Sequence, residues 1–389
     1  MSNAGLVLNP DVLIAAAQAH TGLDDFGAPD VLEPLCHLTE SLIHEACLNE
    51  AGIVGHQLGL ERLLVNRLRF QKILHDHPQV RAEKIRGPIV IIGFPRSGTT
   101  KLQRMTVADP ALQKIPFWRM LNPLPLADDL PGGADARIAI AMAATAYIKD
   151  HFPAFHAAHP MGALEAEEED FLMEHSFATS ATFSANRMPG YQAWVRQSDP
   201  KPFYDLLRLF LQYFQWQDRS SGRMWLLKAT CHLHRLRWLL QAFPDATIVH
   251  CHRDPATSIT SLTDMFCAAR KITSDQVDTR EVRDFTLAYS LMQMQAYFEQ
   301  RPLLEKQHRF VDVSFKDIVA RPFDVIEKVY AAANIELTDE ARAAMRQWEQ
   351  DNPQHKHGKR EYTAEKSGYT ETQLRSDFAP YVECFKQFL

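Results

Sequence analysis

One segment of the sequence combines a strand-type apolar run with a turn rich in hydrogen-bond donors. Residues 89–93 read Ile-Val-Ile-Ile-Gly, and residues 94–101 continue with Phe-Pro-Arg-Ser-Gly-Thr-Thr-Lys. Two glycines allow a tight turn with inward-pointing N–H groups, and an arginine adds a bidentate cation. Hydroxyl groups follow at the positive end of the expected helix, so the turn predicts a site for a phosphate or sulfate group. The candidate ligands are Arg96, Ser97, Gly98, Thr99, Thr100 and Lys101.

The turn differs from the ATP-binding Walker A loop at one decisive position. That loop reads Gly, four residues, Gly, Lys and then Ser or Thr, and its lysine contacts the β- and γ-phosphates. Thr99 stands at the lysine position, and Lys101 comes two residues later. The difference argues against nucleoside triphosphate chemistry, but a small-molecule kinase of the P-loop class stays open as an alternative.

A second segment places a cation and a hydroxyl group at a defined spacing. Residues 246–252 have the pattern of a short buried strand, and Arg253, Asp254 and Pro255 follow directly. Because proline suits the first turn of a helix, Ser261 should lie about two turns along it and face back toward the strand end. The spacing therefore predicts that Arg253 and Ser261 lie close together.

A third strand, over residues 224–229, carries a lysine close to its end. Bulky apolar residues stop abruptly at Lys228, and His232 follows four residues later. Ligands of open α/β sheets bind at the carboxyl edge of the strands. Lys228 is therefore a candidate site cation, and a solvated lysine that ends a strand is the alternative interpretation.

An acidic cluster supplies candidates for a general base. Five of the six residues in 165–170 are carboxylates, and His159 precedes them. Since neighbouring carboxylates repel one another, those that are partly buried should have raised pKa values, which suits a base at neutral pH. Glu168, Glu167 and His159 are the candidates, and an acidic helix start that faces solvent is the alternative.

Taken together, these motifs resemble those of the sulfotransferases that use 3′-phosphoadenosine 5′-phosphosulfate (PAPS). The string Phe-Pro-Arg-Ser-Gly-Thr-Thr is similar to the loop that binds the 5′-phosphosulfate in that family. Arg253 and Ser261 have the spacing of the family's 3′-phosphate pair, and ATP has no 3′-phosphate. The similarity runs from about residue 25 to the end and is strongest to a bacterial branch with a helical N-terminal extension.

The resemblance implies a function and several residue roles. The chain would move the sulfuryl group of PAPS to a hydroxyl of a small hydrophobic alcohol or phenol by in-line displacement, with no metal ion. Lys228 would lie near the bridging oxygen of the scissile bond. Glu168 or Glu167 is preferred over His159 as the base, because similar bacterial sequences carry paired glutamates after His-Pro. A catalytically silent nucleotide-binding protein is a further alternative.

A basic stretch near the C-terminus is the last candidate part of the site. Sulfotransferases commonly close over the 3′-phosphate with a basic, glycine-containing C-terminal segment. Gly358, Lys359 and Arg360 are similar to it in composition. The resemblance implies a donor-closing role for these three residues, and a solvated basic loop is the alternative.

The order of the elements predicts an α/β fold. Strands are expected at 89–93, 224–229, 246–252 and 309–314. Helical stretches separate them, which favours a P-loop-type parallel β-sheet flanked by helices.

Two domains are expected along the chain. An N-terminal helical subdomain would cover residues 1–85, and a sulfotransferase α/β domain would cover 86–389. Within the second, 110–220 is interpreted as a helical acceptor-binding insertion, and 351–389 as a C-terminal donor-closing segment. Aromatic residues that could line the acceptor pocket are Phe152, Phe155, Phe171, Phe177, Phe183, Tyr191, Trp194, Phe203 and Tyr204.

Composition narrows the class of partners. The 389 residues are 46% hydrophobic, enough for a sizeable core, and carry a net charge of −6, so the whole protein has no attraction for nucleic acid or anionic membrane. The most apolar helical stretch, 138–148, is too short to span a bilayer, and no secretory signal is apparent. Six scattered cysteines suit buried thiols in a reducing compartment. We expect a cytoplasmic protein with a small-molecule acceptor and keep a homodimer open.

Overall fold

A five-stranded parallel β-sheet forms the centre of the protein. The computed structural model describes residues 8–126, 135–353 and 367–389. The strand order is β2-β3-β1-β4-β5, and every neighbouring pair is parallel. The strands are β1 (Ile89–Gly93), β2 (Leu112–Gln113), β3 (Met224–Lys228), β4 (Thr247–His252) and β5 (Arg309–Ser314). The four predicted strands are confirmed to within one residue at each end, and the two-residue β2 was not predicted because it is too short to show a pattern.

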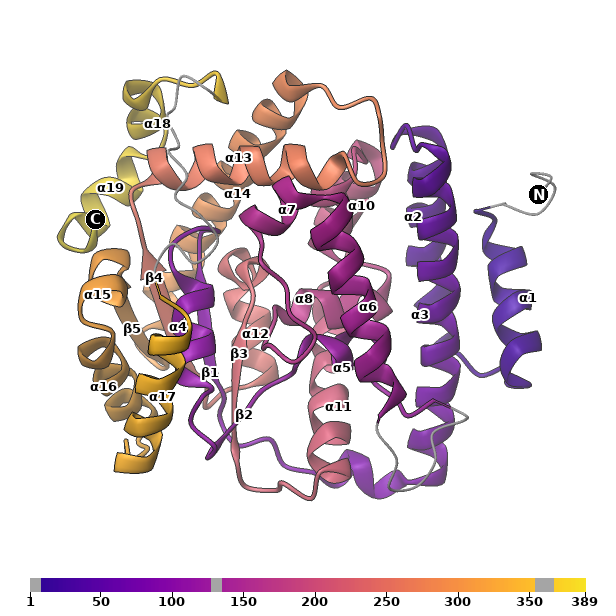
Figure 1. Ribbon diagram of the computed structural model, residues 1–389, viewed down its shortest axis with the longest axis horizontal. Coiled ribbons are helices and arrows are strands. Elements are labelled where there is room, and N and C mark those ends of the chain that lie inside the picture. Colours follow the sequence, from indigo (N-terminus) through magenta and orange to yellow (C-terminus); the bar gives the residue numbers. More distant parts are fainter. Residues whose placement is uncertain (1–7, 127–134, 354–366) are drawn as a thin grey trace.

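Helices cover both faces of the sheet, as the predicted fold class requires (Figure 1). On one face, Val90 and Ile92 of β1 join a core with helices α11 and α12. On the other face, Ile89 and Ile91 pack with α4, α16 and α17. Alternate residues of β1 thus enter opposite cores, which explains why the whole strand is apolar. The helices of these two layers are α4 (Thr99–Thr106), α11 (Lys201–Gln217), α12 (Leu236–Ala242), α14 (Thr279–Leu304), α15 (Phe315–Ala320), α16 (Pro322–Ala333) and α17 (Asp339–Asp351).

The N-terminal residues form helices, as expected. They are α1 (Pro10–Thr21), α2 (Glu33–His44) and α3 (Glu50–Asp76). Leu35 and Leu64 belong to a separate apolar cluster that also contains Phe183 and Tyr191. The long helix α3 also reaches the main core through Phe70. The N-terminal helices therefore pack on residues of the segment 110–220, and the proposed boundary at residue 85 stays a prediction.

The described residues of 110–220 form helices joined by loops, and β2 is the one strand among them. Its helices before α11 are α5 (Phe117–Leu121), α6 (Ala136–His151), α7 (Pro153–Ala158), α8 (Glu169–Leu172), α9 (Ser180–Ala185) and α10 (Pro189–Gln197), with a 3₁₀ turn η3 (Met173–Ser176). A second 3₁₀ turn, η4 (Thr230–His234), follows β3, and α13 (Pro255–Arg270) follows β4. The described C-terminal part contains α18 (Glu371–Asp377) and α19 (Ala379–Phe385).

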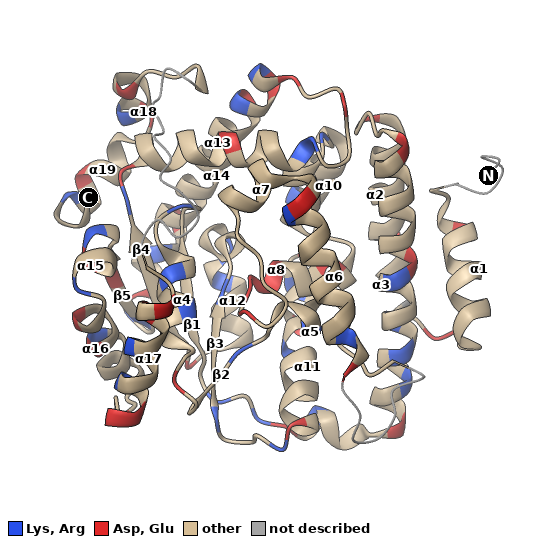
Figure 2. Cartoon of the chain, in the orientation of Figure 1, with Lys and Arg blue, Asp and Glu red and all other residues tan. Residues whose placement is uncertain are grey.

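The structure tests what the composition predicted about surface charge, membrane spans and cysteines, and it agrees with those expectations only in part. Acidic and basic residues are interspersed over the outer helices of the described chain in the view of Figure 2. No described helix has the length and apolarity needed to cross a membrane. None of the six cysteines is in a disulfide, but the expectation that they are buried is wrong for three of them: Cys36, Cys47 and Cys384 are exposed.

Gly93 allows β1 to leave the sheet beside β4. Its φ is +149°, and a Cβ atom at this position would lie 2.6 Å from the carbonyl oxygen of Cys251. Because that neighbour is backbone in a paired strand, it cannot move aside at low cost. The position thus requires glycine for both conformation and space.

We therefore expect Gly93→Ala to lower the free energy of unfolding by about 2 kcal/mol or more, because of the clash and the backbone strain. Urea denaturation followed by circular dichroism measures the change. Gly59→Ala is the matched control: Gly59 lies inside α3 with open space around its Cβ position, so alanine should stabilise the protein by up to about 1 kcal/mol. Equal effects of the two substitutions would contradict this account.

Candidate active site

The turn after β1 has the geometry of an anion-binding loop. Arg96 and Gly98 adopt left-handed conformations, with φ of 72° and 90°, and α4 begins at Thr99. The buried Ser97 hydroxyl donates to the carbonyl oxygen of Phe94 at 2.7 Å, so this hydroxyl holds the turn together. Within the described chain no side chain caps the N-terminus of α4. Its first N–H groups and helix dipole are therefore available to an anion.

Three residues predicted to bind the donor converge on this turn. Arg96 Nε donates to Ser261 Oγ at 3.1 Å, and an Arg253 NH1 group donates to the carbonyl oxygen of Arg96 at 2.6 Å. The Arg253 guanidinium also lies 4.0 Å from the ring centre of Phe315. Helix α13 begins at Pro255, as predicted, and it carries Ser261. The structure thus brings two cations and a hydroxyl group together from two distant segments.

Other predicted donor ligands are placed differently or are not described. Thr99 is buried and Thr100 half-buried at the start of α4. Lys101 Nζ forms an ion pair with Glu349 of α17 at 3.2 Å, so it already has a partner in the neighbouring helix of the same layer. The C-terminal candidates Gly358, Lys359 and Arg360 lie outside the described residues.

Lys228 and Glu168 form an ion pair at the end of β3. Lys228 is fully buried, and its Nζ lies 2.7 Å from Glu168 Oε1. The other oxygen of Glu168 accepts a hydrogen bond from the Thr230 backbone N–H at 3.3 Å. The side chain of Glu168 is 18% exposed, so this carboxylate is partly accessible from solvent. The alternative of a solvated lysine is therefore wrong.

Glu167 differs from its neighbour Glu168 in environment. It is buried among basic side chains, with Oε2 3.2 Å from both His159 Nε2 and Arg104 NH2, and with Oε1 3.8 Å from Lys228 Nζ. Burial alone would raise the pKa of Glu167, but these positive groups outweigh it and hold the pKa far below its ordinary value. The expectation of a raised pKa is wrong here because the cations come from other elements. The expectation of a raised pKa is correct for the buried Asp170, whose pKa is raised by burial.

A hydrogen-bonded chain behind Lys228 was not predicted. Glu169 Oε2 accepts from the Lys228 backbone N–H at 2.8 Å, and Oε1 lies 2.8 Å from His232 Nε2. The other ring nitrogen of His232 is 2.9 Å from the Tyr204 hydroxyl. The spacing of His232 after Lys228 was the only sequence signal. Arg104 on α4 also belongs to the site, and it donates to the Pro160 carbonyl oxygen at 3.0 Å. No pattern in the sequence pointed to this residue.

A cavity of about 160 Å³ adjoins Glu168 and His159. Pro95 of the loop and Thr230 also line it, and Phe155 and Phe171 are the only two of the nine predicted aromatics to do so. Its further apolar lining consists of Ala181, Ala185, Met265, Phe266, Ala269, Ile272 and Tyr289. Five of the nine are buried in the interior instead: Phe177, Phe183, Tyr191, Phe203 and Tyr204.

His250, His252 and Asp312 form the one group among the described residues that could hold a metal ion. Both ring nitrogens of His252 already have partners, the Tyr381 hydroxyl at 2.8 Å and Asp312 at 2.9 Å. Arg301 pairs with Asp312 at 2.9 Å and adds a positive charge that opposes a cation. The group thus works as a polar network that attaches α19 to β4, directly before Arg253.

The charge state of Glu167 leads to a pH-dependent prediction. Because its folded pKa lies below the ordinary value of 4.5, the ionised carboxylate contributes stability above that pH and loses it as pH falls toward the folded pKa. Glu167→Gln should therefore destabilise the protein by about 3 kcal/mol at pH 7, and the difference should shrink below pH of about 4.5. Urea denaturation at several pH values measures it.

The half-exposed Glu165 offers the matched control, since Glu165→Gln removes a carboxylate 3.8 Å from Arg104 at the surface. Its effect should stay below about 1 kcal/mol at all pH values. A Glu167→Gln difference that grows toward acidic pH would overturn this assignment.

Comparisons with known proteins place the chain in a family. Residues 88–339, more than half of the chain, match the model of the Sulfotransferase family. The fold is similar to that of sulfotransferase STF9 from Mycobacterium avium, with a TM-score of 0.86, 22% identity and coverage of 99% of this chain and 98% of that one. Sulfotransferase STF1 from Mycobacterium tuberculosis has a TM-score of 0.77, 26% identity and coverage of 96% and 99%. No curated protein matches. The chain belongs to the sulfotransferase family.

Proposed function

We propose that this chain transfers the sulfuryl group of PAPS to a hydroxyl of a small hydrophobic alcohol or phenol by in-line displacement. The observation that carries the proposal is the convergence of Arg96, Arg253 and Ser261 beside the open N-terminus of α4. A donor with a 5′-phosphosulfate and a 3′-phosphate needs two neighbouring anion sites. ATP has no group for the second one.

The charges around the turn fit such a donor. Arg96 donates to the Ser261 hydroxyl and to the Ala158 carbonyl oxygen, which are both neutral acceptors. Among the described residues, its side chain has these two hydrogen bonds and no ion pair with a carboxylate. Its positive charge is therefore available to an anion. PAPS would supply an activated sulfuryl group, with Arg96, Thr99 and Thr100 at its 5′ end and with Arg253 and Ser261 at its 3′-phosphate.

Glu168 is the best-placed general base. It lines the apolar cavity, whereas Glu167 is enclosed by cations that keep it ionised and lower its basicity. Glu167 then serves to orient Lys228 and His159. When Glu168 takes the proton of the acceptor hydroxyl, it becomes neutral, and Lys228 loses its closest counter-charge. The ammonium group can then stabilise negative charge on the leaving phosphate.

The lining of the cavity supports a hydrophobic acceptor. Phe155, Phe171 and Phe266 line it together with Glu168 and His159. An alcohol or phenol would place its hydroxyl near Glu168 and its body against the aromatic rings. We also infer a cytoplasmic location, because all six cysteines are free thiols.

Ligand-induced stabilisation separates this function from that of a kinase. Adenosine 3′,5′-bisphosphate should raise the melting temperature more than ATP with Mg²⁺, because only the former has a 3′-phosphate. Arg96→Ala and Arg253→Ala should each weaken bisphosphate binding at least tenfold. Arg208→Ala, on the exposed side of α11, is the matched control and should leave binding unchanged. Stronger protection by ATP would exclude the PAPS assignment, and normal binding by both variants would refute the site.

Turnover distinguishes the base candidates. With labelled PAPS and a panel of alcohols and phenols, Glu168→Gln should lower kcat by about 10²- to 10⁴-fold while bisphosphate binding stays unchanged. Glu165→Gln, the same substitution three residues away, should keep normal turnover. Loss of turnover in His159→Ala but not in Glu168→Gln would transfer the role to His159. Bisphosphate binding without turnover of any acceptor would indicate a silent binding protein.

A further inference from the structure

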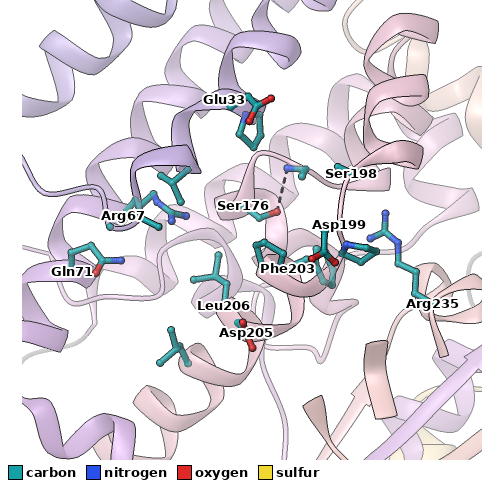
Figure 3. A pocket seen from close by; sticks show the side chains of 18 of the residues that line it. Glu33, Arg67, Gln71, Ser176, Ser198, Asp199, Phe203, Asp205, Leu206 and Arg235 are labelled. Carbon is teal, nitrogen blue, oxygen red and sulfur yellow. Dashed lines mark hydrogen bonds between the residues drawn. The ribbon is translucent and has the colours of Figure 1, made fainter. Parts of the chain in front are cut away.

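A second and larger cavity lies between the N-terminal helices and α11 (Figure 3). Its volume is about 520 Å³, within the range of small-molecule sites. It shares no lining residue with the cavity beside Glu168. Helices α3 and α11, the 3₁₀ turn η3, the turn between α10 and α11, and Arg235 after η4 all contribute to the walls. The other wall residues are Gly27, Ala28, Val31, Glu33 and Pro34.

Arg235 brings to this cavity a buried guanidinium that has no ion-pair partner among the described residues. The residue is only 6% exposed, and its NH1 group has no hydrogen-bond partner among the described residues. Its guanidinium carbon lies 5.4 Å from the ring centre of Phe203, which is also part of the cavity wall. A buried guanidinium N–H without an acceptor is costly. An anionic group in the cavity would supply the counter-charge that this buried guanidinium lacks.

The acidic groups near Arg235 already have other partners. Asp170, whose pKa is raised by burial and lowered in part by the charge of Arg235, accepts from the hydroxyls of Thr179 and Ser180 at 2.6 and 2.7 Å. Asp205 on α11 pairs with Lys201 and Arg208. These carboxylates therefore have their own hydrogen bonds, and no ion pair is formed between either of them and Arg235 within the described chain.

The remaining wall is largely apolar, with charges of both signs. Val31, Pro34, Leu206 and Leu209 contribute hydrocarbon surface. In Figure 3, Arg235 lies on one side of the cavity, and Arg67 lies on the opposite side, on α3. Exposed acids such as Glu33 and Asp199 line the cavity as well and disfavour a highly charged anion.

We propose that this cavity binds a monoanionic amphiphile, whose carboxylate or sulfate head lies against Arg235 and whose aliphatic or aromatic body packs on Phe203 and Leu206. The head provides a counter-charge for the buried Arg235 guanidinium. The body removes apolar wall from water. The site is separate from the donor and acceptor sites and does not depend on the proposed transfer reaction.

Calorimetric titration of the full-length protein tests the site, with octanoate, octyl sulfate and uncharged octanol as probes. At least one anion should bind, and more tightly than octanol. Arg235→Gln should weaken that binding about tenfold or more. Arg237→Gln is the matched control, because Arg237 is exposed on α12 and does not line the cavity. Octanoate and octyl sulfate distinguish a carboxylate head from a sulfate head.

A second variant makes the test independent of the buried arginine. Ala28 lies at the exposed rim, so Ala28→Trp should block the cavity without disturbing the core. If Arg235→Gln does not fold by circular dichroism, Ala28→Trp decides alone. The proposal is overturned if neither anion binds at concentrations up to about 10 mM. It is also overturned if octanol binds as tightly, if Ala28→Trp leaves binding unchanged, or if saturating adenosine 3′,5′-bisphosphate displaces the anion.

Discussion

The buried charge of Lys228 is the constraint around which the site is arranged. An ammonium group with no solvent exposure requires a close counter-charge, and Glu168 provides it at 2.7 Å. This pairing holds the acidic segment against the end of β3. Glu167 and Glu169 then contact Arg104 and the Lys228 backbone, so the same three consecutive glutamates join α4 to the sheet. Donor loop and acidic segment are thereby held in one fixed arrangement.

Parallel topology explains why residues so distant in sequence share one site. All five strands end at the same edge, and β1 lies between β3 and β4. Lys228 ends β3, and Arg253 directly follows β4. The loop after β1 thus has a cation from each neighbouring strand beside it. The central position of β1 makes the convergence a result of the strand order rather than of loop length.

The sequence predicted those features that are local in the chain. The strands are continuous apolar runs, and the Arg253 to Ser261 spacing is set by one helix start. By contrast, the chain from Glu169 through His232 to Tyr204 joins three elements, and its partners lie 28 and 63 positions apart. The low pKa of Glu167 likewise depends on cations from other elements. Its acidic neighbours in the sequence therefore predicted a raised pKa, which is the wrong direction.

The central position of β1 also has a consequence for synthesis of the protein. Ile89 pairs with Leu226 of β3 and with Thr247 of β4, which both leave the ribosome more than 130 residues after it. At translation rates of about 5–20 residues per second, this apolar strand stays without either partner for roughly ten seconds. During that interval its edges and its apolar faces are open to other chains. A nascent polypeptide of this sequence is therefore a natural client for chaperones that shield exposed strands.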